Sequence, residues 1–163
     1  ITDTCTDIFD CQQASLMLLE KEEQALQVCS ATGHSNRETV MQSTQKIGEG
    51  IAGWVAEHRE PLILTNDTDP GKYPGLQFTA RAANACMVVP IILRDELVGV
   101  LNVSSRSENA TYTEEDLQAL QVFAENAGTC IRHTEQAEWM RQTIQKLQAS
   151  LKEKTAQGVP EAT

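Results

Sequence analysis

The stretch 85-ACMVVPIILRDELVGVLNVSS-105 carries the strongest strand pattern in this chain of 163 residues. Two apolar runs flank the polar turn at residues 94–96, and this arrangement is typical of a β-hairpin. Proline has no backbone N–H to donate, so Pro90 indicates an edge, a bulge or an outward-facing amide in the first strand. The longest apolar run is too short to span a bilayer. The sequence therefore predicts a central antiparallel hairpin.

More strands are predicted on the N-terminal side of this hairpin. An apolar run at residues 14–19 and an alternating run at 25–33 flank the polar letters EKEEQ, which predicts a second hairpin. Residues 34–46 are polar and predict a loop or irregular structure. Residues 61–65 predict another strand, and the turn formers at 66–76 predict a long loop.

The residues GEGIAG at 48–53 match the sequence motif G-x-G-x-x-G of dinucleotide-binding proteins. Apolar residues follow it at helical spacing and predict a helix over residues 50–59. The motif also needs a buried strand immediately before it, but the preceding letters MQSTQKI are mostly polar. The pattern therefore favours two glycines that bend the chain into a helix and a third that packs closely against a neighbour.

The C-terminal part predicts one long helix over residues 114–154. Thr113 with Asp116 three positions later resembles a capping box at its start. Two series of apolar or small residues follow at 3–4 spacing: Leu117, Leu120, Ala124, Ala127 and Ile131, and then Ala137, Met140, Ile144, Leu147 and Leu151. The slip between the two series indicates where the stripe stops facing its own sheet. Residues 155–163 are expected to form a disordered tail.

Composition excludes several classes of function. The formal net charge is −10, from 13 basic and 23 acidic residues. Such a charge repels phosphate backbones and anionic membranes, so we predict no nucleic-acid binding and no membrane insertion. The five cysteines form no C-x-x-C pair and the three histidines no i, i+4 pair, so no metal site is predicted. This cysteine usage favours the cytoplasm. The first residue is not Met, and we expect the chain to be a piece of a longer protein.

The order of these elements resembles the GAF domain family. The residues that carry the resemblance are IGEGIAGWVAEHREPLILTND (47–67), FTARAANACMVVPIILRDELVGVLNVSS (78–105) and YTEEDLQAL (112–120). The resemblance implies an α+β fold with a central antiparallel β-sheet of five or six strands flanked by helices, and a long C-terminal helix. It implies a sensory domain over residues 1–133 with a truncated N-terminal helix. Residues 134–154 would form a coiled-coil signalling helix.

The resemblance also implies a regulatory function rather than an enzyme. Such a domain binds a small molecule or dimerises, and thereby controls an output domain on the same chain, and the expected source is a multidomain bacterial signalling protein. No catalytic residues and no particular ligand or cofactor are indicated. The expected contacts to an anionic ligand are Arg81, Asn102, Asp67, Thr79 and Phe78. A salt bridge from Arg81 to Asp67 or Asp69 remains an equal alternative for that arginine.

Three alternatives remain open. A ligand-free dimerisation scaffold fits the same pattern. In cyclic-nucleotide-binding members of the family, Asn102 and Asp116 have counterparts, but other positions of that motif differ here. Cys86 lies near the segment where reductases of free methionine sulfoxide carry catalytic cysteines, yet it is expected to be buried and inert in a strand. Bilin attachment is disfavoured because no cysteine is followed by histidine.

A homodimer through the terminal helices is also predicted. The second apolar series lies beyond the expected end of the globular domain, where the helix has no core of its own to cover these side chains. The expected interface residues are Leu117, Leu120, Ile131, Met140, Ile144, Leu147 and Leu151.

Overall fold

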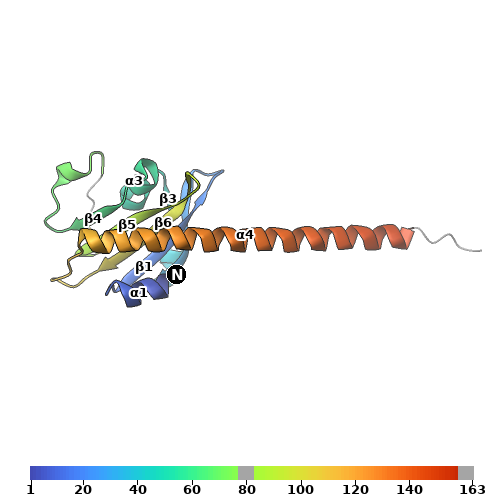
Figure 1. The fold of residues 1–163 in the computed structure, drawn as a ribbon, viewed down its shortest axis with the longest axis horizontal. Coiled ribbons are helices and arrows are strands. Elements are labelled where there is room, and N and C mark those ends of the chain that lie inside the picture. Colours follow the sequence, from blue (N-terminus) through green and yellow to red (C-terminus); the bar gives the residue numbers. More distant parts are fainter. Residues whose placement is uncertain (77–82, 158–163) are drawn as a thin grey trace, which may run out of the picture. The chain divides into compact units, whose positions relative to one another are not determined.

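Six strands form one antiparallel sheet in the computed structural model, in the order β3-β2-β1-β6-β5-β4 (Figure 1). The structure describes residues 1–76 and 83–157, with the backbone alone for Pro70 and residues 151–157. The strands are β1 (Gln13–Glu20), β2 (Ala25–Thr32), β3 (Thr44–Lys46), β4 (Leu62–Thr65), β5 (Ala85–Leu93) and β6 (Glu96–Ser105). The helices are α1 (Thr2–Ile8), α2 (Arg37–Met41), α3 (Gly50–His58), the 3-10 turn η1 (Pro70–Lys72) and α4 (Glu114–Gln157). The predicted α+β fold is confirmed.

The contacts divide the chain into two compact units. The first, Ile1–Gly128, contains the sheet, α1, α2, α3 and the first part of α4. The second unit begins at Thr129 and contains the rest of α4, which ends three residues beyond the predicted Lys154.

The predicted hairpin is formed by β5 and β6, and Glu96 belongs to β6 rather than to the turn. Arg94 and Asp95 both have positive φ angles, 52° and 65°, as a tight two-residue hairpin turn requires. Pro90 lies beyond Val88, the last residue of β5 that pairs with β4, and the register with β6 shifts between Ile91 and Ile92. The missing N–H therefore interrupts no pairing with β4, and a bulge close to Pro90 was one of the predicted outcomes.

Residues 34–46 are not all irregular, which corrects the prediction from sequence. They contain the short helix α2 and the short strand β3, which pairs with β2. The Gln27 side chain donates a hydrogen bond of 3.0 Å to the Met41 carbonyl and so ties the end of α2 to β2. No residue of α2 is buried. A helix that buries no side chain needs no apolar residues at helical spacing, and without such a pattern it could not be predicted from the sequence.

The glycines of GEGIAG shape the entry to α3. Gly48 and Gly50 have φ angles of 84° and 60°, which are accessible to glycine without strain. A Cβ at Gly53 would meet the Lys46 carbonyl oxygen, so this position needs a residue without a side chain. The Gly48 N–H also donates to the Gly53 carbonyl at 2.9 Å. These contacts confirm the interpretation that two glycines bend the chain and the third packs closely.

The sheet has a different partner on each face. Met17, Val88 and Val100 belong to the buried cluster that includes Trp54 and Val55 of α3. Residues at the alternate positions of β6, Leu101 and Val103, are also completely buried and point to the opposite face. Figure 1 shows the first part of α4 across that face, and its residues Leu117, Leu120, Ala124 and Ala127 are buried.

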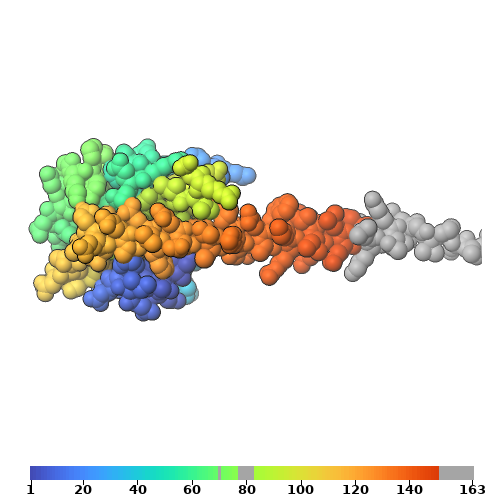
Figure 2. Space-filling model, in the orientation of Figure 1, coloured from blue at the N-terminus to red at the C-terminus, as the bar shows by residue number. Residues whose placement is uncertain are grey.

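Helix α1 lies beside the first part of α4. In Figure 2 the blue N-terminal segment adjoins the orange part of α4 on the molecular surface. The rings of Phe9 and Phe123 meet edge to face there, with 6.5 Å between their centroids. This aromatic pair joins the end of α1 to α4, which covers the same face of the sheet.

The outward-facing backbone groups of the edge strand β4 are occupied by nearby side chains and turns. The Ile63 N–H donates to the Tyr73 hydroxyl at 3.1 Å, and the same hydroxyl donates to the Ile63 carbonyl at 3.2 Å. The Thr65 N–H donates to the Thr68 hydroxyl at 2.7 Å, and the Thr68 N–H donates to the Thr65 carbonyl at 3.3 Å. The loop after β4 thus caps the strand that precedes it.

The predicted capping box begins α4. The N–H and the hydroxyl of Thr113 both donate to Asp116 Oδ2 at 2.8 Å, and the Asp116 N–H donates to Thr113 Oγ1 at 3.2 Å. We expect Thr113→Ala to lower the free energy of unfolding in urea by about 1 kcal/mol, because the first turn loses its side-chain acceptor. Thr111→Ala, at an exposed threonine two residues earlier, is the matched control. Equal losses in the two variants would contradict a role for the cap.

Candidate binding pocket

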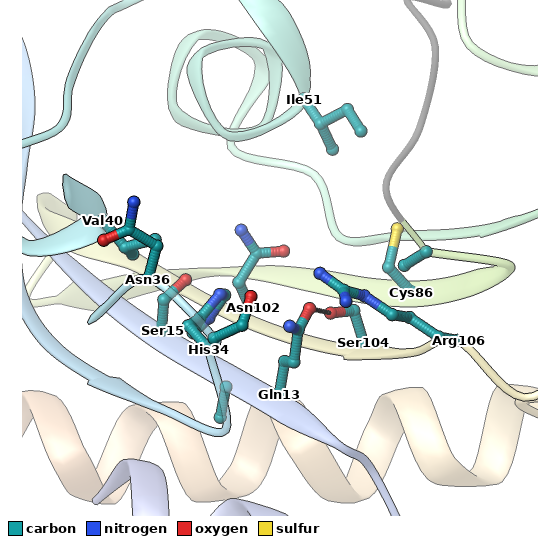
Figure 3. Close-up of a pocket in the computed structure, with 13 residues that line it drawn as sticks. Gln13, Ser15, His34, Asn36, Val40, Ile51, Cys86, Asn102, Ser104 and Arg106 are labelled. Carbon is teal, nitrogen blue, oxygen red and sulfur yellow. Dashed lines mark hydrogen bonds between the residues drawn. The ribbon is translucent and has the colours of Figure 1, made fainter. Parts of the chain in front are cut away.

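A cavity of about 460 Å³ lies over the beginning of β1 and the end of β6 (Figure 3). Its volume is in the range of small-molecule sites in proteins. The described residues that line it are Gln13, Ala14, Ser15, His34, Ser35, Asn36, Val40, Ile51, Ala83, Cys86, Asn102, Ser104 and Arg106. They come from the sheet, from the segment that includes α2, from α3 and from the residues that flank β5 and β6.

Strand register brings the polar floor of the cavity together. Gln13 pairs with Ser104, and Ser15 pairs with Asn102, across the β1–β6 ladder. These residues alternate with Ala14 and Val103, so their side chains leave the same face of the sheet as Met17 and Val100 further along. The apolar side chains of Met17 and Val100 belong to the core under α3. Where β1 begins and β6 ends, the same face carries polar side chains, and the space above them is the cavity.

Three polar side chains at this cavity have groups without a hydrogen-bond partner among the described residues. They are the Asn102 amide, the Arg106 guanidinium and His34 Nε2, and the His34 nitrogen is buried. Figure 3 shows Asn102 and Arg106 projecting from the strand layer into the space below Ile51. Polar groups that lack protein partners are available to a ligand or to water.

The backbone of Arg106 is fixed although its guanidinium is not. Its N–H donates to Gln12 Oε1 at 2.9 Å, and its carbonyl accepts from Asn84 Nδ2 at 2.8 Å. These two bonds hold the residue at the end of β6, so its side chain starts from a defined point at the rim of the cavity.

The electrostatics of the cavity favour a neutral His34. Burial lowers the pKa of its imidazole, and the nearby positive charge of Arg106 lowers the pKa further, while a hydrogen bond with the Ala14 backbone opposes both effects. No Asp or Glu is among the described residues that line the cavity. Among its described residues, the lining therefore contains one permanent positive charge and no negative side chain to balance it.

Cys86 lies at the side of this cavity. It is buried in β5, as the sequence predicted, but its sulfur faces the space above the strands in Figure 3. It is the single cysteine among the described lining residues.

The predicted ligand contacts have different locations. Asn102 lines the cavity, whereas Asp67 is exposed and is not among the described lining residues. Phe78, Thr79 and Arg81 lie outside the described residues. Several polar lining residues were not predicted from the sequence: Gln13, Ser15, His34, Asn36, Ser104 and Arg106. The available signal was the period of two in β6, which places Ser104 on the same face as Asn102.

Trp54 and His58 contact each other and the surrounding core rather than the cavity. Trp54 is buried, and His58 stacks on it with 4.1 Å between ring centroids. His58 Nδ1 lies 3.0 Å from the Trp54 carbonyl oxygen. In the two stretches that the structure describes, no group of three or more His, Cys, Asp or Glu is arranged to hold a metal ion.

The residues predicted for a dimer interface fall into two sets. Leu117 and Leu120 are buried within the first unit, so their own domain already covers them. Ile131 is half-buried. Met140, Ile144 and Leu147 are exposed, at 58%, 54% and 60%, and Trp139, which the sequence analysis did not name, is exposed at 66%. The Leu151 side chain is outside the described part.

Comparison with known proteins agrees with this architecture. The family model described as "GAF domain" matches residues 1–132. The GAF domain of an Acinetobacter phosphoenolpyruvate-protein phosphotransferase superimposes with a TM-score of 0.70 at 21% identity, covering 83% of this chain and 80% of that one. The free methionine-R-sulfoxide reductase of Neisseria meningitidis, solved in complex with its substrate, gives 0.66 at 17% identity, covering 83% and 76%.

A curated relative is the probable 3',5'-cyclic phosphodiesterase pde-5 of Caenorhabditis elegans. It is 23% identical over 154 residues, which cover 88% of this chain and 21% of the relative. The chain thus spans about a fifth of the length of that protein.

The fold and its cavity define a regulatory or sensory module of the kind found in signalling proteins. The chain belongs to the GAF domain family. Within its described part, none of the helices is both long enough and apolar enough to cross a membrane.

Proposed function

We propose that this GAF domain binds a small molecule in the cavity over β1 and β6 and thereby controls an output domain on the same polypeptide. The observation that carries the proposal is the set of three polar side chains, Asn102, His34 and Arg106, that have unpaired groups at one cavity of small-molecule size. They belong to different segments of the chain, so a ligand that contacts all three links these segments. Binding then stabilises one arrangement of the domain.

Strand β6 offers a direct path from the ligand to α4. Asn102 faces the cavity, while its neighbours Leu101 and Val103 are buried on the opposite face of the sheet, where the first part of α4 packs. A shift of β6 on ligand binding changes the surface on which Leu117 and Leu120 rest. We propose that α4 carries this change towards the output domain.

We also propose that the protein is a homodimer held by its terminal helices. The exposed large hydrophobic residues of the described chain all belong to α1, the residue before it, or α4: Ile1, Ile8, Val122, Trp139, Met140, Ile144 and Leu147. Exposed apolar side chains gathered on particular elements mark interaction surfaces. The 3–4 spacing of Met140, Ile144 and Leu147 is that of a helix paired with another helix.

Thermal unfolding against a panel of small carboxylates and cyclic nucleotides tests the ligand. A compound present at about 100 times its dissociation constant is expected to add roughly 2.7 kcal/mol to the free energy of unfolding. Asn102→Ala is expected to weaken or abolish this gain, because it removes the amide at the cavity floor. Asn126→Ala, on the exposed surface of α4, is the matched control. A ligand that stabilises the Asn102→Ala variant equally well does not use this cavity.

Three alternatives give different results in these assays, in sedimentation or in an assay of turnover. A ligand-free dimerisation scaffold shows no stabilisation by any compound and still sediments as a dimer. A cyclic-nucleotide module is stabilised by cyclic nucleotides alone, although Asp116, one of the two positions shared with that motif, is used to cap α4. A reductase oxidises an external thiol as it converts free methionine sulfoxide, and Cys86→Ser abolishes the turnover.

A further inference from the structure

The charge at the cavity is opposite to the charge of the chain. The protein has a formal net charge of −10, with 23 acidic residues, yet the described lining contains Arg106 and His34 and no carboxylate. A negatively charged surface repels anions unless a local site compensates for it. An unbalanced guanidinium beside a cavity is such a site, because arginine binds carboxylate and phosphate oxygens through two parallel N–H donors.

The donors surround the same part of the cavity. Arg106 is anchored through its backbone and has no ion pair or side-chain hydrogen bond with a described residue. His34 is close enough for the charge of Arg106 to lower its pKa, and its Nε2 is buried without a partner. The Asn102 amide rises from the floor between the strands (Figure 3). Val40 and Ile51 are apolar residues of the same lining, and Ile51 lies across the space from Asn102 and Arg106 in Figure 3.

We propose that the cavity selects a small organic anion, with its carboxylate or phosphate oxygens held by Arg106 and His34 and its apolar body against Val40 and Ile51. This inference rests on the function proposed above and names the chemical class of the ligand. Asn102 supplies a further hydrogen bond that does not depend on the charge of the ligand.

Binding of the anion is coupled to protonation of the His34 imidazole. In the free protein, burial and Arg106 hold the pKa of His34 below its usual value, and an anion in contact with the ring raises it again. The protein therefore takes up a proton on binding, and affinity increases as pH falls through the interval between the two pKa values. Above both values the affinity no longer changes for this reason. The other titratable side chains of the described lining are Arg106 and Cys86.

Calorimetric titration with three probes of one shape tests this inference: 2-naphthoate, 2-naphthyl phosphate and the neutral 2-naphthamide. At pH 7 we expect at least one of the two anions to bind about tenfold or more tightly than the amide, and comparison of the two shows which head group fits. Arg106→Met is expected to weaken that anion about 10- to 100-fold and to leave the amide within about threefold. Arg106 is exposed, so the variant is expected to fold normally.

The control is Arg141→Met, which makes the same charge change at an exposed position of α4. His34→Gln provides a separate readout, since it should remove the increase in anion affinity between about pH 7.5 and 5.5. If the amide binds as tightly as the anions and Asn102→Ala weakens it, the cavity is a ligand site but the anion inference is wrong. Anion binding that Arg106→Met leaves unchanged also overturns it. If neither anion binds at about 1 mM, the anion inference is also wrong, whatever the thermal-unfolding panel shows.

Discussion

We expect the double variant Ile144→Asp, Leu147→Asp to sediment as a monomer at concentrations where the unmodified protein is a dimer. Both side chains are more than half exposed, so they have no core of their own. Burying each against a second helix contributes about 1.5 to 3 kcal/mol at full burial. The substitutions remove this gain and place carboxylates opposite carboxylates in a parallel pair. Since every 1.4 kcal/mol is a factor of about ten in affinity, the dimer is expected to weaken by several orders of magnitude.

The control for this experiment adds the same charge on the other side of the helix. Gln142→Asp, Ala149→Asp changes two exposed residues that lie away from the Met140–Ile144–Leu147 stripe in a heptad. This variant is expected to remain dimeric, and both variants are expected to keep the circular dichroism of the folded sheet. An unmodified protein that is already monomeric at high micromolar concentration would remove the basis for a signalling helix.

We expect Trp54→Ala to lower the free energy of unfolding by about 3 to 5 kcal/mol, because it opens a large cavity in the core. Trp54 is 3% exposed, and its Nε1–H donates to the Pro74 carbonyl at 2.9 Å. Its ring also meets that of Tyr73 edge to face at 5.5 Å. The substitution therefore disconnects α3 from the loop after β4, and we expect faster proteolysis of that loop together with the loss of stability measured in urea.

Trp54→Phe separates packing from hydrogen bonding. It retains most of the apolar volume but leaves the Pro74 carbonyl without its donor, so a smaller loss of about 1 to 3 kcal/mol is expected. A loss below about 1 kcal/mol in Trp54→Ala would mean that the core tolerates the cavity and that the loop is held by other contacts.

Local signals in the sequence were sufficient for much of the fold. The two apolar runs and the short polar turn between them in residues 85–105 predicted the β5–β6 hairpin, because both strands are largely buried and adjacent in sequence. The capping box at Thr113 involves residues three positions apart, so its chemistry is visible in the sequence alone. The short elements α2 and β3 were missed because they bury little apolar surface and show no periodicity.

The cavity depends on contacts that are remote in sequence. Gln13 and Ser104 are 91 positions apart, and only the pairing of β1 with β6 brings them together. Strand order and register within a sheet do not follow from the pattern of one strand. For the same reason Arg106, which follows β6, was not recognised as a candidate for anion binding, whereas Arg81 was proposed from family resemblance. Asn102 was identified because the resemblance pointed to its position.

The capped edge of the sheet limits how the protein can associate. An exposed strand with free N–H and carbonyl groups acts as a template on which another chain adds a strand, and repeated addition produces filaments or aggregates. At β4 this route is blocked, because Tyr73 and Thr68 occupy the groups of Ile63 and Thr65 that point outward. The opposite edge is β3, which is only three residues long. Two helices that pair form a dimer and stop there, whereas strands can be added to a sheet edge without limit. The dimer proposed above, paired through its helices, therefore benefits from a sheet with one capped edge and one very short edge.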